Sequence, residues 1–336
     1  MPGSEAHADT ADIERPFQPR HHARRTPEKT AFHICATGET VSFAALEARA
    51  NQGAHRLRAL VLRPGDHIAL LMENRREFLE IAFAADRSGV YYTAISTHLT
   101  EAEVLHILRD CGARLLIASD RFAPLARSLG AELGDTLRIE IVGTPAEGLG
   151  HWCAAAAACP ETPIDDEAEG LDMLYSSGTT GRPKGIKWPL SGQSPGGRSM
   201  LLDLLTGLFG YSSETRYLCT APLYHAAPLR HSMVTIRVGG TVHVMGRFDT
   251  TEALRLIEAH RITHSQWVPT MFVRLLKLPE AERRRFDLSS QALAVHAAAP
   301  CPVAVKRAMI DWWGPILHEY YAGTALLHKS RQGFIS

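Results

Sequence analysis

The sequence predicts an α/β protein built from two lobes. Short apolar segments typical of buried strands alternate with amphipathic helical segments, and this order occurs twice along the chain. A connector rich in alanine, glycine and acidic residues, at about 144–170, separates the two runs. The chain has 336 residues, which at roughly 100–200 residues per domain corresponds to two domains or lobes. Strands that alternate with helices predict βαβ units and mostly parallel sheets.

The first lobe is expected at about 26–150, after a leader over residues 1–25. The leader is rich in charge, histidine and proline and has no periodic apolar pattern, so we expect it to be flexible. Thr100 and Glu103 form the pattern of a capping box and predict a helix start. The periodicity predicts helices at 43–62, 76–87, 100–111 and 121–129, and strands at 67–72, 90–95, 114–118 and 137–142.

The second lobe is expected at about 170–325. A helix is predicted at 201–209, and Asp249 and Glu252 predict the capped start of another helix. Strands are predicted at 171–175, 216–220, 241–245, 264–268, 293–296 and 315–320.

Composition excludes several classes of protein. Thirty-six Lys and Arg residues balance thirty-six Asp and Glu residues, so no net charge attracts nucleic acid or an anionic membrane. The six cysteines form no Cys-x-x-Cys pair, which indicates free thiols in a reducing cytoplasm rather than a zinc site or disulfide framework. No apolar run reaches the ~18 residues that a membrane span needs. We therefore expect a cytoplasmic protein with no nucleic-acid partner and no membrane span; homo-oligomerisation stays open.

A loop rich in glycine and hydroxyl residues, at 173–185, is the first candidate site. Glycines allow a backbone to approach a ligand closely, and N–H groups, hydroxyls and the Lys184 ammonium together suit phosphate oxygens. The alternative is a flexible surface loop. The loop is not a nucleoside-triphosphatase P-loop, because Lys184 follows Pro183 and the chain continues as a strand rather than a helix.

Two other patterns in the sequence are poor candidates for a site. Residues 192–196 match the Gly-x-Ser-x-Gly elbow of serine hydrolases, but Pro195 follows the serine and has no N–H for an oxyanion hole. His260 and His264 have an i, i+4 spacing that some metal sites use. They straddle a predicted helix–strand junction without a Glu or Cys ligand set, so structural or surface roles are expected. His225 is a better candidate, because it follows a predicted strand where ligand-contacting loops lie in open α/β sheets.

Four segments together resemble a known family. Residues 175–185 (Tyr-Ser-Ser-Gly-Thr-Thr-Gly-Arg-Pro-Lys-Gly) are similar to the signature loop of the adenylate-forming enzymes, the acyl-CoA synthetase superfamily. Residues 222–225 (Pro-Leu-Tyr-His), 297–300 (Ala-Ala-Ala-Pro) and 320–324 (Tyr-Tyr-Ala-Gly-Thr) resemble three further motifs of that family, in the family order. The resemblance covers about residues 26–324 and implies the two stacked α/β lobes of the family's N-terminal domain.

The resemblance implies an AMP-forming acid–CoA ligase. ATP and Mg²⁺ would serve as co-substrate and metal, a carboxylic acid would become an acyl-adenylate, and CoA would be the acceptor. The third motif resembles a Gly-Ala-Pro loop on the adenine side. The family pattern places the ATP phosphates at Ser176, Ser177, Gly178, Thr179, Thr180, Gly181, Lys184 and Gly185. It places the acyl-carboxylate pocket at His225, Trp267 and Met271, and the adenine and AMP contacts at Ala297, Ala298, Ala299, Pro300, Tyr321, Ala322, Gly323 and Thr324.

The sequence departs from the family at the end of the last motif. Ala325 stands where a glutamate would bind magnesium, so no protein ligand for a metal is expected. Residues 326–336 form a divergent tail, and the β-rich subdomain and C-terminal lid of the family have no counterpart. We therefore expect a C-terminally truncated member, and two hypotheses remain: a ligase for a fatty or other apolar acid, or a catalytically inactive nucleotide-binding fragment. The 297–301 segment and 185–187 are closer to fatty-acid or bile-acid CoA ligases than to peptide-synthetase modules.

Overall fold

The computed structural model describes residues 16–176 and 184–320, which form two compact units. The first unit contains residues 16–29, 41–176, 184–197 and 223–225; the second contains 30–40, 198–222 and 226–320. Each unit is built on its own sheet with helices on both faces, so the predicted α/β class is confirmed. The units are not two consecutive halves of the chain, because the segment 30–40 lies in the second unit. No helix within the described ranges is long and apolar enough to cross a membrane.

The sheet of the first unit is parallel throughout. Its strand order is β7-β6-β5-β3-β4-β8, with every pair of neighbours parallel. The strands are β3 (His67–Leu71), β4 (Tyr91–Ala94), β5 (Leu115–Ser119), β6 (Arg138–Val142), β7 (Gly150–His151) and β8 (Leu171–Asp172). β3, β4 and β5 are buried along their whole length, as continuous apolar strands of a parallel sheet should be.

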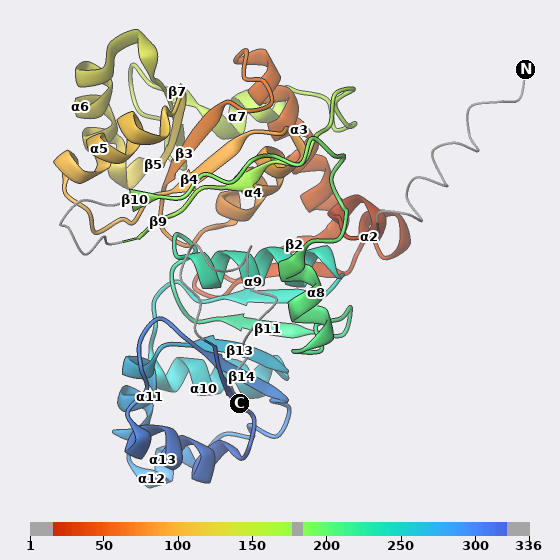
Figure 1. The fold of residues 1–336 in the computed structure, drawn as a ribbon, viewed down its shortest axis with the longest axis vertical. Helices are drawn as coiled ribbons and strands as arrows, with labels where there is room; N and C mark the ends of the chain where they lie inside the picture. The colour runs from red at the N-terminus through yellow and green to blue at the C-terminus, as the bar shows by residue number, and fades with distance from the viewer. Residues whose placement is uncertain (1–15, 177–183, 321–336) are drawn as a thin grey trace, which may run out of the picture. The chain divides into compact units, whose positions relative to one another are not determined.

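Helices cover both faces of this sheet (Figure 1). α5 (Glu101–Cys111) and α6 (Ala123–Leu133) pack on one face and share a core with β3, β5 and β6. The capping box predicted for Thr100 and Glu103 is present at the start of α5. The remaining helices are α2 (Pro19–Arg25), α3 (Phe43–Ala59), α4 (Arg76–Arg87) and α7 (Trp152–Ala157), with short 3₁₀ turns η1 (Asp120–Phe122) and η2 (Gly134–Thr136).

The sheet of the second unit combines strands from two distant parts of the sequence. The strands at one of its edges come from the beginning of the chain. Its order is β15-β14-β13-β11-β12-β1-β2, and the pairs from β15 to β1 are parallel. The strands are β1 (Thr30–Ile34), β2 (Glu39–Ser42), β11 (Arg216–Cys219), β12 (Thr241–Val244), β13 (His264–Trp267), β14 (Leu293–His296) and β15 (Leu317–Glu319). β1 joins β12 across more than two hundred residues, and Thr241 Oγ1 donates a hydrogen bond to the Thr30 carbonyl oxygen.

Helices again cover both faces (Figure 1). α10 (Thr250–Ala259), α11 (Pro269–Leu276) and α13 (Val303–Trp313) enclose an apolar core with β11, β13 and β14. α9 (Ala226–Arg237) contacts β11 and β12 and packs beside α8 (Met200–Gly207). α12 (Glu280–Arg283) is a single short turn.

The structure corrects the predicted boundaries at two places. Residues 19–25 were expected to belong to a flexible leader, but they form α2, which begins at a helix-compatible proline. Arg20 holds this helix in place through ion pairs with Glu47 and Glu167. The second lobe was expected to begin at about 170, but β8 pairs with β4 in the first sheet. A Cβ atom on Gly170 would lie 2.4 Å from the Ala85 carbonyl oxygen, so only glycine allows this close approach.

Candidate functional site

The loops that carry the candidate motifs of the second unit leave one edge of its sheet. β11 is followed in sequence by β12 on one side and then by β13 on the other side, so the chain changes direction between β11 and β13. In open α/β sheets, ligands bind beyond the carboxyl ends of the strands at such a switch point. Residues 220–222, 268–271 and 297–300 follow directly after β11, β13 and β14. The topology therefore brings segments that lie far apart in the sequence to neighbouring strand ends.

Thr220 links two of these strand ends. Its buried hydroxyl donates a hydrogen bond of 2.5 Å to the carbonyl oxygen of Gln266 and lies 3.4 Å from the sulfur of Met271. The bond links the residue after β11 to Gln266 near the carboxyl end of β13, shortly before α11 begins. This contact fixes the spacing of the two strand ends on the β11–β13 side of the switch point.

Trp267 and Met271, the two predicted pocket residues of this unit, are both buried. Trp267 has no exposed surface, donates from Nε1 to Ser265 Oγ at 2.8 Å and packs against Phe272 and Trp313. Met271 keeps 8% of its surface exposed. Trp267 therefore contributes to the core beneath the strand ends in this structure, and its role as an acyl-pocket wall stays a prediction.

The segment 297–300 has a strained backbone at its second position. Ala298 has φ of 76°, in the left-handed region that disfavours residues with a Cβ atom. Ala298, Ala299 and Pro300 are exposed, whereas Ala297 is buried. Strain of this kind persists where the surrounding structure fixes the backbone, and it often marks ligand-contacting turns. The adenine-side role of the segment stays a prediction that this conformation supports.

His225 lies in the first unit, at the carboxyl end of its sheet. The neighbouring Leu223 donates its backbone N–H to Asn74 Oδ1 at 2.8 Å, and Asn74 follows β3. His225 is exposed as a residue, but its ring contacts the buried Tyr224 edge-on at a centroid distance of 4.7 Å. Partial enclosure of the ring and the nearby His98 lower the pKa of His225. The imidazole is therefore neutral at physiological pH and can accept or donate a hydrogen bond.

The described ends of the glycine-rich loop form a short antiparallel ladder. β9 (Tyr175–Ser176) pairs with β10 (Lys184–Gly185), with Lys184 opposite Ser176 and Gly185 opposite Tyr175. Lys184 is exposed. The predicted contacts at Ser177, Gly178, Thr179, Thr180 and Gly181 lie outside the described residues. So do Tyr321, Ala322, Gly323, Thr324 and Ala325.

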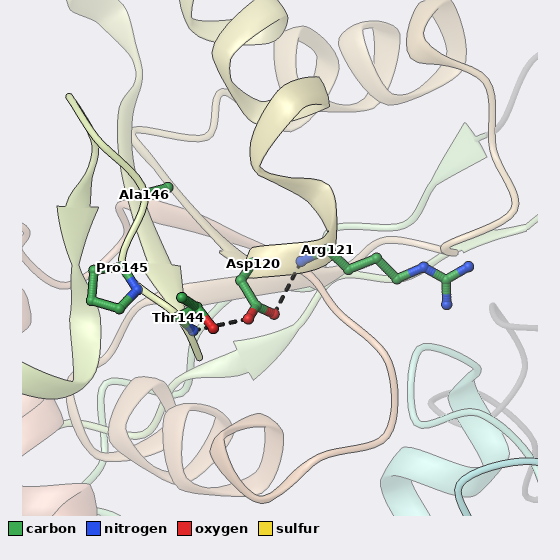
Figure 2. A pocket seen from close by; sticks show the side chains of 5 residues that line it. All are labelled: Asp120, Arg121, Thr144, Pro145 and Ala146. Carbon is green, nitrogen blue, oxygen red and sulfur yellow. Dashed lines mark hydrogen bonds between the residues drawn. The ribbon is translucent and has the colours of Figure 1, made fainter.

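A shallow pocket of about 470 Å³ opens at the carboxyl ends of β5 and β6 in the first unit (Figure 2). Its lining consists of Asp120, Arg121, Thr144, Pro145 and Ala146. Both oxygens of Asp120 accept backbone hydrogen bonds, from Arg121 at 3.0 Å and from Thr144 at 2.9 Å, and these bonds lower the pKa of its carboxyl. The Arg121 guanidinium points away from Asp120 (Figure 2). The carboxylate is thus engaged in holding two loops together, and the pocket offers no reacting group.

Sequence reasoning missed a histidine directly before the adenine-side segment. His296, the last residue of β14, has no exposed surface, and neither of its ring nitrogens has a hydrogen-bond partner among the described residues. Burial lowers its pKa, against a smaller opposing effect from Glu319. In the sequence, the sign of this residue is a histidine at the end of an otherwise apolar strand that leads into Ala297. The serine-hydrolase alternative gains nothing, since residues 186–199 form neither the strand nor the helix of a nucleophile elbow.

These features define a class of protein: an open α/β fold whose motif-bearing loops follow the carboxyl ends of adjacent parallel strands. The chain belongs to the family of AMP-binding enzymes, whose match spans residues 19–326. The resemblance stated from the four motifs is therefore confirmed at the level of the family.

Named relatives agree with this assignment. The chain is 33% identical over 298 residues to a feruloyl-CoA synthase of an Amycolatopsis species, covering 87% of this chain and 56% of that protein. It is 30% identical over 286 residues to the fatty acid–[acyl-carrier-protein] ligase ScoC of Streptomyces coeruleorubidus, covering 84% and 53%. The crystal structure of ATP-bound MatB from Rhodopseudomonas palustris superposes with a TM-score of 0.73 at 26% identity, covering 91% of this chain and 60% of that one. The chain thus spans little more than half the length of these relatives.

Proposed function

We propose that this chain activates a carboxylic acid with ATP, in the first half-reaction of an AMP-forming acid–CoA ligase. One observation carries the proposal: loops with the family's motifs follow adjacent strand ends at the switch point between β11 and β13. The family assignment and the ligase names of the relatives support the same reaction.

The proposed reaction is a displacement at phosphorus. A carboxylate oxygen bonds to the α-phosphorus of ATP, the bond from that phosphorus to the bridging oxygen breaks, and pyrophosphate leaves. The products are an acyl-adenylate and pyrophosphate, and no electrons are transferred to an outside acceptor. Charge shifts onto the departing phosphate oxygens, where positioned N–H groups, hydroxyls and a cation are most effective. We assign the cation to Lys184 and the hydroxyls to Ser176, Ser177, Thr179 and Thr180.

The acid and the acceptor are proposed from the relatives. We propose a fatty or other apolar acid, including an aromatic one, since the relatives include a feruloyl-CoA synthase and a fatty acid ligase. His225 borders the carboxylate in this proposal, because its ring is neutral and partly enclosed. CoA is the proposed acceptor of the acyl group. All six cysteines are free thiols, which supports a cytoplasmic location.

Magnesium does not fit the proposed protein ligand position. Ala325 stands where the family pattern has a glutamate, and a methyl group offers no oxygen to a hard cation. The side chain at this position therefore cannot hold magnesium, and Mg²⁺ is supplied with ATP in the test.

Pyrophosphate release tests the proposal directly. The chain is incubated with Mg-ATP and, in separate reactions, a hydroxycinnamic acid, a medium-chain fatty acid and a short dicarboxylic acid. We expect acid-dependent pyrophosphate release with one of the two apolar acids and a loss of roughly 10²–10³-fold in Lys184→Ala. Lys277→Ala is the matched control, because Lys277 is an exposed lysine at the end of α11.

The alternative function is a catalytically inactive nucleotide-binding fragment. It predicts saturable ATP binding that Lys184→Ala weakens, without pyrophosphate release for any acid. That result would overturn the proposed reaction while leaving the family assignment unchanged.

A further inference from the structure

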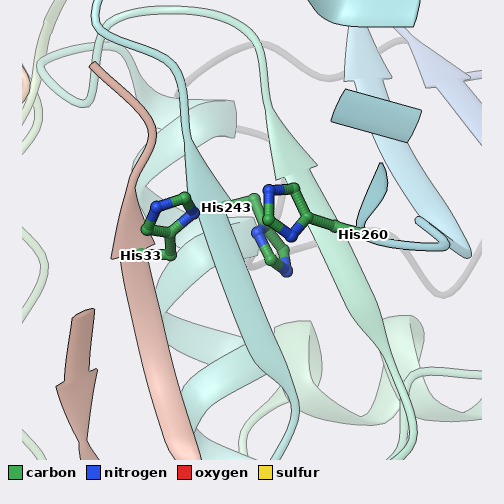
Figure 3. Close-up of side chains that lie close together, drawn as sticks. All are labelled: His33, His243 and His260. Atoms are coloured by element: carbon green, nitrogen blue, oxygen red, sulfur yellow. The ribbon is translucent and has the colours of Figure 1, made fainter. Parts of the chain in front are cut away.

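Three histidines converge on one face of the sheet in the second unit. His33 on β1 and His243 on β12 are register partners on adjacent parallel strands, so their side chains project from the same face. His243 is also the register partner of Leu218 on β11, which packs in the core with α10. His260, the C-cap residue of α10, reaches the two strand histidines from above that face (Figure 3).

The rings are close enough to share one ion. One nitrogen from each histidine can be chosen so that the three lie within 4.8 Å of one another. Ring centroids are 4.3 Å apart for His243 and His260, 5.1 Å for His33 and His260, and 5.6 Å for His33 and His243. Three nitrogens bound to one zinc ion at about 2.1 Å lie roughly 3.4 Å apart. Ring rotations that bring the histidine nitrogens closer by about an ångström would therefore allow all three to bind one ion.

His243 is buried, and one of its ring nitrogens has no hydrogen-bond partner in the part of the chain that the structure describes. The residue is 7% exposed, and the nitrogen is Nδ1. An unpaired buried nitrogen costs free energy, and a bound metal ion would remove that cost. Figure 3 shows the His243 ring close to the His260 ring, with the His33 ring to one side of both.

Two further groups adjoin the cluster. Arg255 is paired with Glu252 through two hydrogen bonds of 2.7 Å. The Glu252 carboxylate therefore offsets the positive charge of Arg255, which would otherwise repel a metal ion bound to the histidines. Cys35 follows β1, and its sulfur lies 3.8 Å from Nδ1 of His33. A fourth ligand can therefore be this sulfur or a water molecule, as in three-histidine zinc sites.

We propose that His33, His243 and His260 bind one divalent transition-metal ion, with zinc as the representative species. Imidazole is the ligand that suits zinc, copper and nickel, whereas magnesium and calcium prefer oxygen. Such a site ties the end of α10 to β1 and β12, so it is structural, and it does not depend on the proposed ligase activity.

Zinc titration of the metal-free full chain, prepared without a histidine tag, tests the site. We expect one zinc ion per chain in isothermal titration calorimetry and a higher thermal midpoint with zinc than with the chelator EDTA. His260→Gln and His33→Gln should each weaken zinc binding by at least roughly 100-fold. Cobalt substitution should give visible absorption bands typical of four-coordinate nitrogen-containing sites, and this spectrum should be lost in the same variants.

The control is a double variant, His21→Gln with His22→Gln. It removes two histidines that are adjacent to each other in α2 of the first unit. It should bind zinc as the natural sequence does. Absence of one-to-one binding, or unchanged binding in both His260→Gln and His33→Gln, would show that the three rings only pack against one another. Circular dichroism confirms folding of each variant, and the cobalt spectrum of the unmutated chain decides the matter where a variant does not fold.

Discussion

Gly185 and Tyr175 are opposite each other in the ladder that closes the glycine-rich loop, and the glycine leaves room for the aromatic ring. A Cβ atom on Gly185 would lie 2.6 Å from Cζ of Tyr175 and 2.5 Å from Cε of Met173. The hydroxyl of Tyr175 donates a hydrogen bond of 2.5 Å to Asp110 at the end of α5. The hydrogen bond to Asp110 therefore holds the Tyr175 ring in the space that a side chain at position 185 would need.

Gly185→Ala should weaken ATP binding. The new methyl group must push the Tyr175 ring or the β10 backbone aside, so the loop ends can no longer pair as they do here. We expect at least a tenfold higher dissociation constant for ATP, measured by calorimetry. Gly197→Ala is the matched control, because a Cβ atom there meets nothing within 4 Å. Equal ATP affinity in the two variants would contradict a positioning role for Gly185.

Ala298→Gly should stabilise the second unit. Ala298 has φ of 76°, which costs an alanine about 1 kcal/mol relative to a glycine, and part of this gain is offset by the flexibility of glycine in the unfolded chain. We expect the free energy of unfolding in urea to rise by about 0.5 kcal/mol. Ala299→Gly, at an exposed neighbour outside the left-handed region, should instead lower it slightly. The opposite order of the two variants would argue against strain at Ala298.

The strand ends that define the switch point could be predicted from the sequence. β11, β13 and β14 lie within the predicted segments 216–220, 264–268 and 293–296, because buried parallel strands are short apolar runs bounded by loops. Local capping patterns were equally informative: Thr100 starts α5 and Asp249 starts α10 through side-chain hydrogen bonds to the third helical residue.

What the sequence could not predict depends on contacts between distant residues. β1 has no local feature that names β12 as its partner, so its place in the second sheet was missed. α2 lacks an apolar period and depends on the ion pairs of Arg20. The spacing of His260 and His264 does not bring the two rings to one site: His264 bonds to the Phe209 carbonyl oxygen, whereas His260 lies beside His33 and His243.

Glu47→Gln should destabilise the first unit. It should also reduce the loss of unfolding free energy as the pH falls below 4.5. Glu47 forms two hydrogen bonds to the guanidinium of Arg87, which is only 3% exposed, and a third to Arg20. Burial alone would raise the pKa of Glu47, but the charges of Arg87 and Arg20 outweigh it and lower the pKa below its usual value of 4.5. The folded state therefore gains stability above pH 4.5 that is lost as the pH falls below it.

Removing this carboxylate leaves the buried Arg87 with Glu167, at 4.0 Å, as its remaining carboxylate partner, which should cost about 3 kcal/mol at pH 7. Urea unfolding at pH 7 and pH 4 measures both effects. Glu132→Gln is the control, since its pair with Arg109 is more than half exposed on both sides and should change stability by less than about 1 kcal/mol. A Glu47→Gln protein as stable as this control would contradict the role given to the buried pair.

Each unit contains a buried histidine that should lower its free energy of unfolding below neutral pH. Burial lowers the pKa of His67 in the first unit to about 4, with a smaller effect of Lys187, and lowers the pKa of His231 in the second unit to about 3, with a smaller effect of His264. Below pH 6.5 the unfolded chain takes up protons that the folded rings cannot accept, so stability falls as the pH falls toward these folded values.

At pH 5 each histidine should lower the free energy of unfolding by about 2 kcal/mol relative to pH 7. His231→Gln breaks the 2.7 Å contact between Nδ1 and the Tyr211 hydroxyl, so it lowers stability at pH 7 as well. The informative quantity is the difference between pH 7 and pH 5, which should shrink by about 2 kcal/mol in His231→Gln. Replacing the exposed His318 should leave this difference unchanged. If His231→Gln retained the full difference, protonation of other groups would have to account for the acid sensitivity.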